Sequence, residues 1–304
     1  GDTPNIILFL VDDLGWQDTS VQFGPQPTGF NSRYRTPAME ALADRGLLFT
    51  DAYSASPVCT PTRTSIMTGQ SPGRSRISYW TLHPNRDTSK QHPRLKAPAW
   101  RMEGLQPDDL TMPQLLRDSG YRTIHAGKAH FGAVGTPGAD PCNLGFDVNI
   151  AGHGPGGPGS YYGIHDFKAR KRQGKDGDSV WDVPGLEKYH GQDIFLTEAI
   201  TTEVVAAIEE SAAMNKPFFV NFAPYAVHAP IMPNSRYLSS YKDIQQQEAA
   251  YATLIESMDA ALNTLVSTLD RLELSRNTII IFASDNGGLS AHARGGEPHI
   301  HNAP

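Results

Sequence analysis

Short apolar segments, each the length of one strand, are the feature of this chain that most restricts its fold. Residues Asn5–Val11 are apolar and β-branched, with no alternation between polar and apolar side chains. A strand with this pattern is typically buried on both faces. Strands are also predicted at Arg122–Ala126, Phe218–Ala223 and Thr278–Ala283, and helical patterns separate them. This alternation predicts an α/β fold in which helices cover both faces of a sheet.

Apolar residues at helical spacing fill most of the intervals between these strands. The predicted helices cover Pro37–Arg45, Thr64–Thr68, Thr111–Ser119, Ile194–Met214 and Gln246–Leu272. Thr36 is suited to the N-cap of the first helix, and Pro37 to its first turn. A further strand is expected at Leu47–Ala52. Two long intervals, residues 71–109 and 132–192, lack periodicity and are predicted to be loops.

The composition argues against several classes of protein. The 304 residues carry a formal charge of −6, and without a basic excess a nucleic-acid surface is not expected. No apolar run is long enough to span a bilayer. The two cysteines are too few for a disulfide framework, and no Cys or His spacing typical of zinc sites occurs. One large domain and two small ones are both compatible with this length.

Residues that could bind a metal ion follow two of the predicted strands. Asp12 and Asp13 follow the first strand, and Asp285 and Asn286 follow the last. Such oxygen donors, without His or Cys, are suited to calcium or magnesium. Each motif taken singly is more often a turn. However, adjacent carboxylates at the ends of buried strands repel each other unless a cation neutralises them, which favours a metal site.

A cysteine lies in the pattern C-x-P-x-R, formed by Cys59-Thr60-Pro61-Thr62-Arg63. A buried structural cysteine is one interpretation. A thiolate nucleophile, with a pKa that Arg63 lowers, is another. The segment continues into Ile66-Met67-Thr68-Gly69, which gives the pattern a wider context.

Further reactive side chains follow the remaining strands. Lys128 and His130 come after Arg122–Ala126, and His228 comes after Phe218–Ala223. In open α/β sheets, ligands bind at the carboxyl ends of the strands. Reactive residues at several such ends are harder to explain by packing than any one of them alone.

In their order along the chain, these motifs resemble those of the type I sulfatases, which are formylglycine-dependent enzymes of the alkaline phosphatase-like superfamily. The resemblance rests on C-x-P-x-R followed by an apolar pair and Thr-Gly, and on four other segments that together cover nearly the whole chain. These segments are Asn5–Gly15 with its aspartate pair, Gly127–His130, Tyr225–Pro230 and Ser284–Gly287. The resemblance implies an alkaline phosphatase-like sandwich, with a central, mostly parallel mixed β-sheet flanked by helices on both faces.

The resemblance also implies a sulfuric ester hydrolase whose nucleophile derives from Cys59. A maturation enzyme would oxidise Cys59 to Cα-formylglycine before folding, and the aldehyde would hydrate to a geminal diol. One hydroxyl attacks sulfur and displaces the alcohol; the other then loses its proton, and sulfate is eliminated. Thr62, where many relatives carry Ser or Ala, is a small departure that bears on the efficiency of maturation.

Each motif residue receives a role from this resemblance. The implied ligands of the Ca²⁺ ion are Asp12, Asp13, Asp285 and Asn286. Arg63 would fix the formylglycine hydrate, and Lys128 would contact the sulfate oxygens. His130 would be the base of the elimination, and His228 would bind sulfate or protonate the leaving oxygen.

Other residues are weaker candidates. His125 lies inside a predicted strand and is expected to pack in the core. His153, in a glycine-rich loop, and Arg294, after the second metal motif, are candidate substrate contacts, although both fit solvated loops equally well. Aromatic and basic residues of the two irregular regions suit a sulfated sugar, but such residues are also common on surface loops. They are Trp80, Trp100 and Trp181, with Arg74, Arg76, Arg94 and Arg101.

Two other functions fit the same residues. One is a phosphonate or phosphate monoester hydrolase that uses the same formylglycine. The other is an inactive sugar-binding protein, in which Cys59 stays unmodified. Abundant loops favour a carbohydrate sulfate over a small aryl sulfate, by analogy with relatives.

Residues 1–304 are expected to form the N-terminal catalytic domain of such a protein. Relatives continue with another sulfate-binding lysine and a smaller C-terminal subdomain, and neither follows Pro304 here. The expected location is the periplasm or the extracellular space, with an export signal already removed before Gly1. The expected partners are a sulfated small molecule or glycan and the formylglycine-generating enzyme.

Overall fold

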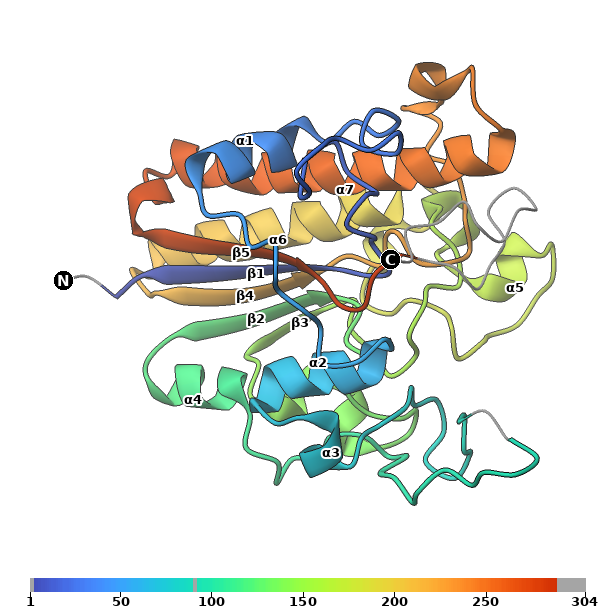
Figure 1. Cartoon of the computed structure of the whole chain (residues 1–304). Coiled ribbons are helices and arrows are strands. Elements are labelled where there is room, and N and C mark those ends of the chain that lie inside the picture. Colours follow the sequence, from blue (N-terminus) through green and yellow to red (C-terminus); the bar gives the residue numbers. More distant parts are fainter. Residues whose placement is uncertain (1–2, 90–91, 289–304) are drawn as a thin grey trace.

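A central parallel sheet organises the protein, as a computed structural model describing residues 3–89 and 92–288 shows (Figure 1). The strands of this part of the chain lie in the order β3-β2-β4-β1-β5, and every neighbouring pair is parallel. Their bounds are β1 Asn5–Val11, β2 Arg122–Gly127, β3 Val148–Ile150, β4 Phe218–Ala223 and β5 Thr278–Ser284. The predicted α/β fold is thus confirmed, although the sheet, which was expected to be mixed, is entirely parallel among the described residues.

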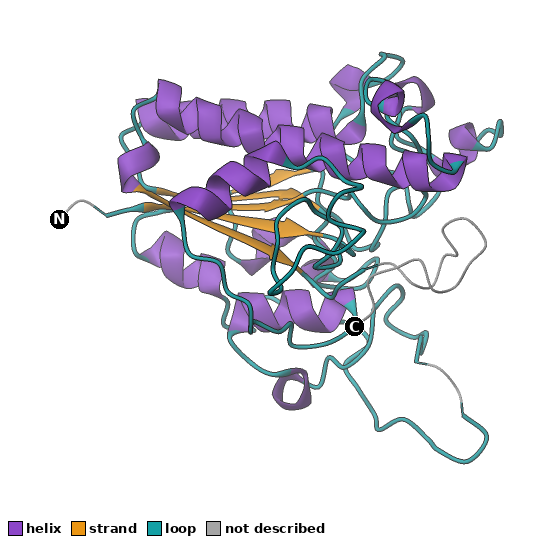
Figure 2. Cartoon of the chain, turned by 45° about the horizontal axis from the view of Figure 1, so that its top comes forward, coloured by secondary structure: helices purple, strands orange, loops and turns teal. Residues whose placement is uncertain are grey.

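Helices cover both faces of the sheet (Figures 1 and 2). One layer contains α1 (Pro37–Arg45), α6 (Leu196–Ala213) and α7 (Gln246–Arg271). The other contains α2 (Cys59–Thr68), α3 (Pro72–Ser75) and α4 (Met112–Asp118). The short helix α5 (Ala169–Arg172) lies beyond the carboxyl ends of the strands (Figure 1). The connections contain short 3₁₀ helices at Pro137–Ala139, Pro141–Leu144, Gly163–His165, Glu187–Tyr189, Leu238–Tyr241 and Ser275–Asn277.

Strand β1 illustrates why the sequence lacks polar alternation. Ile7, Phe9 and Val11 belong to the core that β1 shares with α6 and α7. Leu8 and Leu10 face the opposite way and join a second core with α2. Because successive side chains of a strand point to opposite faces, a strand between two helical layers must be apolar at every position.

Helix α1 is fastened at its N-terminus by a residue distant in sequence. Thr36 occupies the N-cap position as predicted, but its side chain makes no capping bond. Instead, the backbone N–H groups of Ala38 and Met39 donate to the carboxylate of Asp259 in α7, at 3.0 and 2.9 Å. The Thr36 hydroxyl bonds with Ser20. The helix terminus is therefore satisfied by tertiary structure.

The strand predicted at Leu47–Ala52 is wrong. This segment is irregular and runs from the layer of α1 to the layer of α2 (Figure 1). Leu47 and Phe49 are 86% and 71% exposed, so the described residues do not bury these apolar side chains. Helix α2 also differs from its prediction, because it begins at Cys59 itself and not at Thr64. None of the helices in the described part of the chain is long and apolar enough to cross a membrane.

Candidate active site

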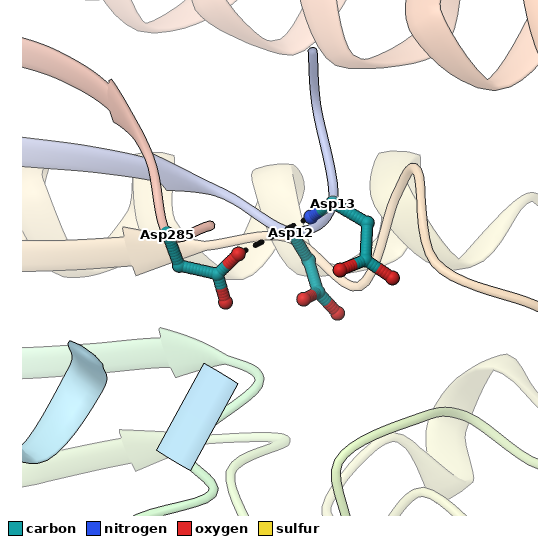
Figure 3. Close-up of side chains that lie close together, drawn as sticks. All are labelled: Asp12, Asp13 and Asp285. Carbon is teal, nitrogen blue, oxygen red and sulfur yellow. Dashed lines mark hydrogen bonds between the residues drawn. The ribbon is translucent and has the colours of Figure 1, made fainter. Parts of the chain in front are cut away.

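Three carboxylates converge at the carboxyl ends of β1 and β5 (Figure 3). Asp12 and Asp13 follow β1, and Asp285 follows β5; the register pairs Val11 with Ser284, which brings the two ends together. One oxygen from each carboxylate lies within 4.8 Å of the others, and all three residues are buried. The Asp13 backbone N–H donates to Asp285 Oδ1 at 3.2 Å.

Two buried cations lie against this cluster. Lys128 Nζ donates to both oxygens of Asp12 at 2.7 Å. Arg63 Nε donates to Asp285 Oδ2 at 2.8 Å, and its Nη1 donates to the Lys128 carbonyl at 2.7 Å. All of these side chains are inaccessible to solvent. Three ionised carboxylates against two cations leave one negative charge without a partner.

The carboxylates respond differently to this environment. Burial raises the pKa of Asp12 well above its ordinary value, an effect that Lys128 opposes and the neighbouring aspartates reinforce. Burial also acts on Asp285, but the charges of Arg63 and Lys128 outweigh it and lower the pKa of Asp285. A further cation at the cluster would oppose the burial and repulsion that raise the pKa of Asp12.

The residues of this cluster fit a hard divalent cation. All donors are oxygens, as calcium and magnesium prefer. Asn286 Nδ2 donates to Asp13 Oδ1 at 2.6 Å, and Asn286 Oδ1 is buried without any hydrogen-bond partner. A buried amide oxygen without a partner is costly unless a ligand satisfies it. Asn286 would supply that oxygen to an ion held by Asp12, Asp13 and Asp285.

Cys59 is the first residue of α2. Thr62 holds the preceding loop, because its hydroxyl donates to the Ser56 carbonyl and accepts from the Ser56 N–H. Arg63 lies one turn after Cys59 and therefore on the same side of the helix. Gly69 ends α2 in the left-handed conformation, with φ 65°. The motif thus directs Cys59 and Arg63 toward the carboxylates.

The thiol of Cys59 is not activated in this environment. Burial raises its pKa to about 11, and the nearby aspartates add to this effect while Lys128 opposes it. A thiol with such a pKa is protonated at neutral pH and is a poor nucleophile. The geometry therefore argues against the alternative of a thiolate whose pKa Arg63 lowers.

His130 lies in the cluster with a defined proton arrangement. Its Nε2 is 2.8 Å from the Thr81 carbonyl, which can only accept, so Nε2 carries the hydrogen. Its Nδ1 is buried without a partner. Burial, with Lys128 nearby, holds the pKa of His130 well below the ordinary value. The neutral ring therefore offers Nδ1 as a proton acceptor.

His228 has the opposite arrangement. Its Nδ1 is 2.7 Å from the Ala229 carbonyl, and its Nε2 lies 3.8 Å from Asp13 Oδ2. Burial lowers the pKa of His228 to about 4, with a contribution from Lys128. The Tyr161 hydroxyl holds this loop through the carbonyls of Tyr225 and His228. The Nε2 atom of His228 thus lies near Asp13 of the carboxylate cluster.

A glycine-rich loop packs against both histidines. A Cβ at Gly156 would lie 2.4 Å from His130 Cε1, and one at Gly157 would lie 3.0 Å from His228 Cε1. Any larger residue at Gly156 must therefore displace the imidazole or the loop. The sequence offered only a glycine-rich composition, so neither this contact nor the role of the Thr81 carbonyl was predicted.

The structure also places the remaining candidates. His125 packs in the core as predicted, with its ring against Phe131 and Phe146. His153 packs edge-on against Tyr225, and its carbonyl accepts the His130 N–H at 3.2 Å. Its side chain is not among the groups that contact the carboxylates. Arg294 lies outside the described residues.

The comparisons with known proteins agree with this arrangement. The family model described as "Sulfatase" matches residues 4–303. The chain therefore belongs to the sulfatase family. It is 31% identical to N-acetylgalactosamine-6-sulfatase of Mus musculus over 96% of this chain and 52% of that protein. It is 27% identical to arylsulfatase A of Homo sapiens over 93% of this chain and 52% of the relative. The chain thus spans about half the length of these relatives.

Solved structures support the same fold. The structure of Ps i-CgsB has a TM-score of 0.74 at 28% identity. The matched region covers 94% of this chain and 59% of the Ps i-CgsB chain. The complex of Ps i-CgsB with k-i-k-neocarrahexaose gives a TM-score of 0.73 at 27% identity, with the same coverage. A protein of the alkaline phosphatase superfamily from Vibrio parahaemolyticus shares the fold alone, at 18% identity and a TM-score of 0.55.

Proposed function

We propose that these residues form the catalytic site of a sulfatase that hydrolyses a sulfate ester of a carbohydrate. One observation carries the proposal: Cys59 opens a helix whose Arg63, one turn later, is bonded to a carboxylate of a buried oxygen-donor cluster. A cysteine that only packs in the core does not require an arginine and a carboxylate cluster beside it. A residue that is converted into a nucleophile for an anionic ester requires both.

Two groups complete the proposed site. Cα-formylglycine, made from Cys59 by a maturation enzyme, would supply the nucleophile as its hydrate. Ca²⁺, held by Asp12, Asp13, Asp285 and Asn286, would polarise sulfate oxygens and favour the ionised hydrate. With a divalent ion, the carboxylates and the two buried cations carry an excess of positive charge, which suits an anionic ester.

The cationic side chains would bind and orient the ester. Hydrogen bonds to Asp285 and to the Lys128 carbonyl fix the guanidinium of Arg63, which would hold the hydrate at residue 59 in place. Lys128 would release one Asp12 oxygen to the metal ion and direct Nζ to a sulfate oxygen. Both side chains are inaccessible to solvent, and charge interactions of buried groups are stronger than in water.

The two histidines would divide the proton transfers. His130 is neutral with Nδ1 free, so it would accept the proton lost before sulfate is eliminated. His228 exposes Nε2 next to Asp13. An anionic ester bound there raises the pKa of His228, and its protonated Nε2 would then donate to the leaving oxygen or bind sulfate.

The substrate class rests on the relatives. Several are named N-acetylgalactosamine-6-sulfatase, and a similar structure binds k-i-k-neocarrahexaose. A carbohydrate sulfate is therefore the proposed substrate. The protein would act after export to the periplasm or extracellular space.

Peptide mass spectrometry across Cys59 is the direct test of this function. Material from a host with a formylglycine-generating enzyme should contain a residue that has lost sulfur and two hydrogens and gained one oxygen. An unmodified thiol in such material would support the inactive sugar-binding alternative. Cys59→Ala serves as the control, since it cannot be converted.

Kinetics then separate the two hydrolase candidates. The full-length protein is assayed in parallel on an aryl sulfate and on the matching aryl phosphonate. A higher kcat/KM for the sulfate is expected. A preference for the phosphonate, lost in Cys59→Ala, would assign the same nucleophile to phosphonate hydrolysis and overturn the proposal.

A further inference from the structure

A cavity of about 580 Å³ opens directly beside His228. His228, Ala229 and Pro230 form one wall, together with Gly157 and Pro158 of the glycine-rich loop. Residues of α5 and of the segment after it also line the cavity: Ala169, Arg170, Arg172, Gln173, Lys175, Ser179 and Trp181. His228 thus belongs to this cavity and to the carboxylate cluster, so a ligand that fills the cavity reaches the reacting group.

The charge of this cavity has one sign. Arg170, Arg172 and Lys175 line it, and none of its lining residues is acidic. By contrast, a second cavity of about 310 Å³, lined by His153 among others, includes Asp140. Cations that share one cavity repel each other, so an anion that joins them is favoured.

The lysines of the same segment behave differently. Lys168 is bonded to Asp178 at 2.8 Å, and Lys171 to Asp166 at 2.7 Å. Neither lysine lines the cavity. Within the described part of the chain, Arg170, Arg172 and Lys175 form no salt bridge, although Arg170 acts on Asp178 at longer range. Asp166 and Asp178 are thus paired with these lysines, and Asp182 accepts from the backbone N–H groups of Ala169 and Ser179. The cavity cations therefore keep their donors for a ligand.

An aromatic side chain completes the chemistry of the cavity. Trp181 is partly buried and lines the cavity together with the cations. Indole rings stack on the apolar faces of sugars, and guanidinium groups bind sulfate or carboxylate through paired hydrogen bonds. This combination fits a charged sugar better than it fits either an inorganic anion or a neutral sugar.

We propose that this cavity binds a second anionic sugar of the same glycan chain, next to the one that carries the reacting sulfate. Arg170 and Arg172 would bind its sulfate or carboxylate group, and Trp181 would stack on the ring. The inference rests on the proposed function and adds to it that the preferred substrate is a polyanionic oligosaccharide. The cavity then acts as a specificity site, which small sulfate esters do not reach.

Matched double variants test this inference in the full-length protein. Arg170→Gln with Arg172→Gln removes two cavity cations, whereas Lys168→Gln with Lys171→Gln removes the same charge from the same short segment outside the cavity. Binding is measured in a Cys59→Ala background by tryptophan fluorescence and calorimetry. The probes are chondroitin 6-sulfate hexasaccharide, a neocarrahexaose and N-acetylgalactosamine 6-sulfate.

The arginine pair should weaken binding of a hexasaccharide by about tenfold or more, and the lysine pair by about twofold or less. Binding of N-acetylgalactosamine 6-sulfate should change little in both double variants. In the protein with unaltered Cys59, kcat/KM for an aryl sulfate should also stay unchanged. Equal losses in the two pairs, or a protein that binds neither hexasaccharide, would overturn the inference.

This outcome is distinguishable from a failure of the proposed function. The binding measurement needs no turnover, so it reports on the cavity even if no sulfate ester is hydrolysed. Conversely, aryl sulfate hydrolysis with no difference between the two variant pairs leaves the sulfatase intact and removes the second sugar site. Trp181→Leu gives an independent check, because it should weaken hexasaccharide binding without any change of charge.

Discussion

Lys128 Nζ donates to both carboxylate oxygens of Asp12 at 2.7 Å, and neither side chain is accessible to solvent. A buried ion pair of this kind costs much of its attraction in lost hydration, so it is weak evidence for stability. The ion pair matters because three carboxylates meet at this site and Lys128 neutralises one of them. Lys128 supplies a positive charge that a metal ion could also supply, and the pair is therefore sensitive to calcium.

Lys128→Met should be tolerated in calcium and not in its absence. The variant keeps a long apolar stem but leaves the buried carboxylates with one cation fewer. Without metal, we expect a loss of about 3–5 kcal/mol in the free energy of unfolding. Thermal denaturation in EDTA and in excess calcium measures both values. An equal deficit in the two conditions would show that calcium does not occupy this cluster.

Arg63→Lys tests whether geometry matters at this site beyond charge. Lysine keeps the charge but cannot bond at once to Asp285 and to the Lys128 carbonyl as the guanidinium does. We expect a loss of about 2–4 kcal/mol in chemical denaturation and of about a hundredfold in kcat/KM. Arg271→Lys, at an exposed ion pair with Glu209, should cost less than about 1 kcal/mol. Similar effects at the two positions would contradict this account.

Gly156→Ala should impair turnover with little change in global stability. The new methyl would lie 2.4 Å from His130 Cε1, so the imidazole or the glycine-rich loop must shift, and either movement changes the position of His130 relative to its surroundings. We expect kcat to fall by about tenfold to a hundredfold, while KM changes less. Gly29→Ala is the matched control, because its Cβ would meet nothing within 4 Å. An unaltered kcat in both Gly156→Ala and His130→Ala would show that His130 takes no part in the reaction.

Asp259→Asn should change how stability depends on pH. Burial raises the pKa of Asp259 to about 6, despite hydrogen bonds from Ala38 and Met39 that lower it. The folded protein therefore keeps this proton between the unfolded pKa, near 3.9, and about pH 6. In that window the folded state binds more protons, so the contribution of Asp259 to stability falls as pH rises.

Denaturation of both proteins from pH 4 to pH 7 measures this difference. The stability of the wild type relative to Asp259→Asn should decline up to about pH 6 and then stay constant. A relative stability that rises with pH over the same range would mean that the carboxylate is favoured in its charged form, as a helix cap.

The sequence predicted those parts of the fold that depend on local pattern. β1, β4 and α1 have the predicted bounds, because a doubly buried strand and a proline-started helix are encoded within a few residues. The strand predicted at Leu47–Ala52 does not form, because a short apolar run gives a local preference for strand but does not provide a partner strand to pair with. The short β3 was missed because its three residues pair with β2 and carry no pattern of their own.

The candidate site was predictable to the extent that its chemistry is concentrated in motifs. Asp12, Asp13, Asp285 and Asn286 were expected together because two strands carry them to one edge of the sheet, and the structure brings them together. The tautomers of His130 and His228 depend on carbonyls contributed by loops. The positive charge of the cavity next to His228 depends on which basic residues form ion pairs with acidic ones. The spacing of residues in the sequence does not determine these pairs.

Strand β5 has a neighbour on one side only among the described residues. Ile279 and Ile281 of this strand are half exposed, and Leu47 and Phe49 add apolar surface elsewhere. A free strand edge with apolar side chains is a template for pairing with another chain. A protein that contains only these residues should therefore be prone to self-association. Aggregation through β5, and not a defect of the active site, would then limit the activity that can be measured.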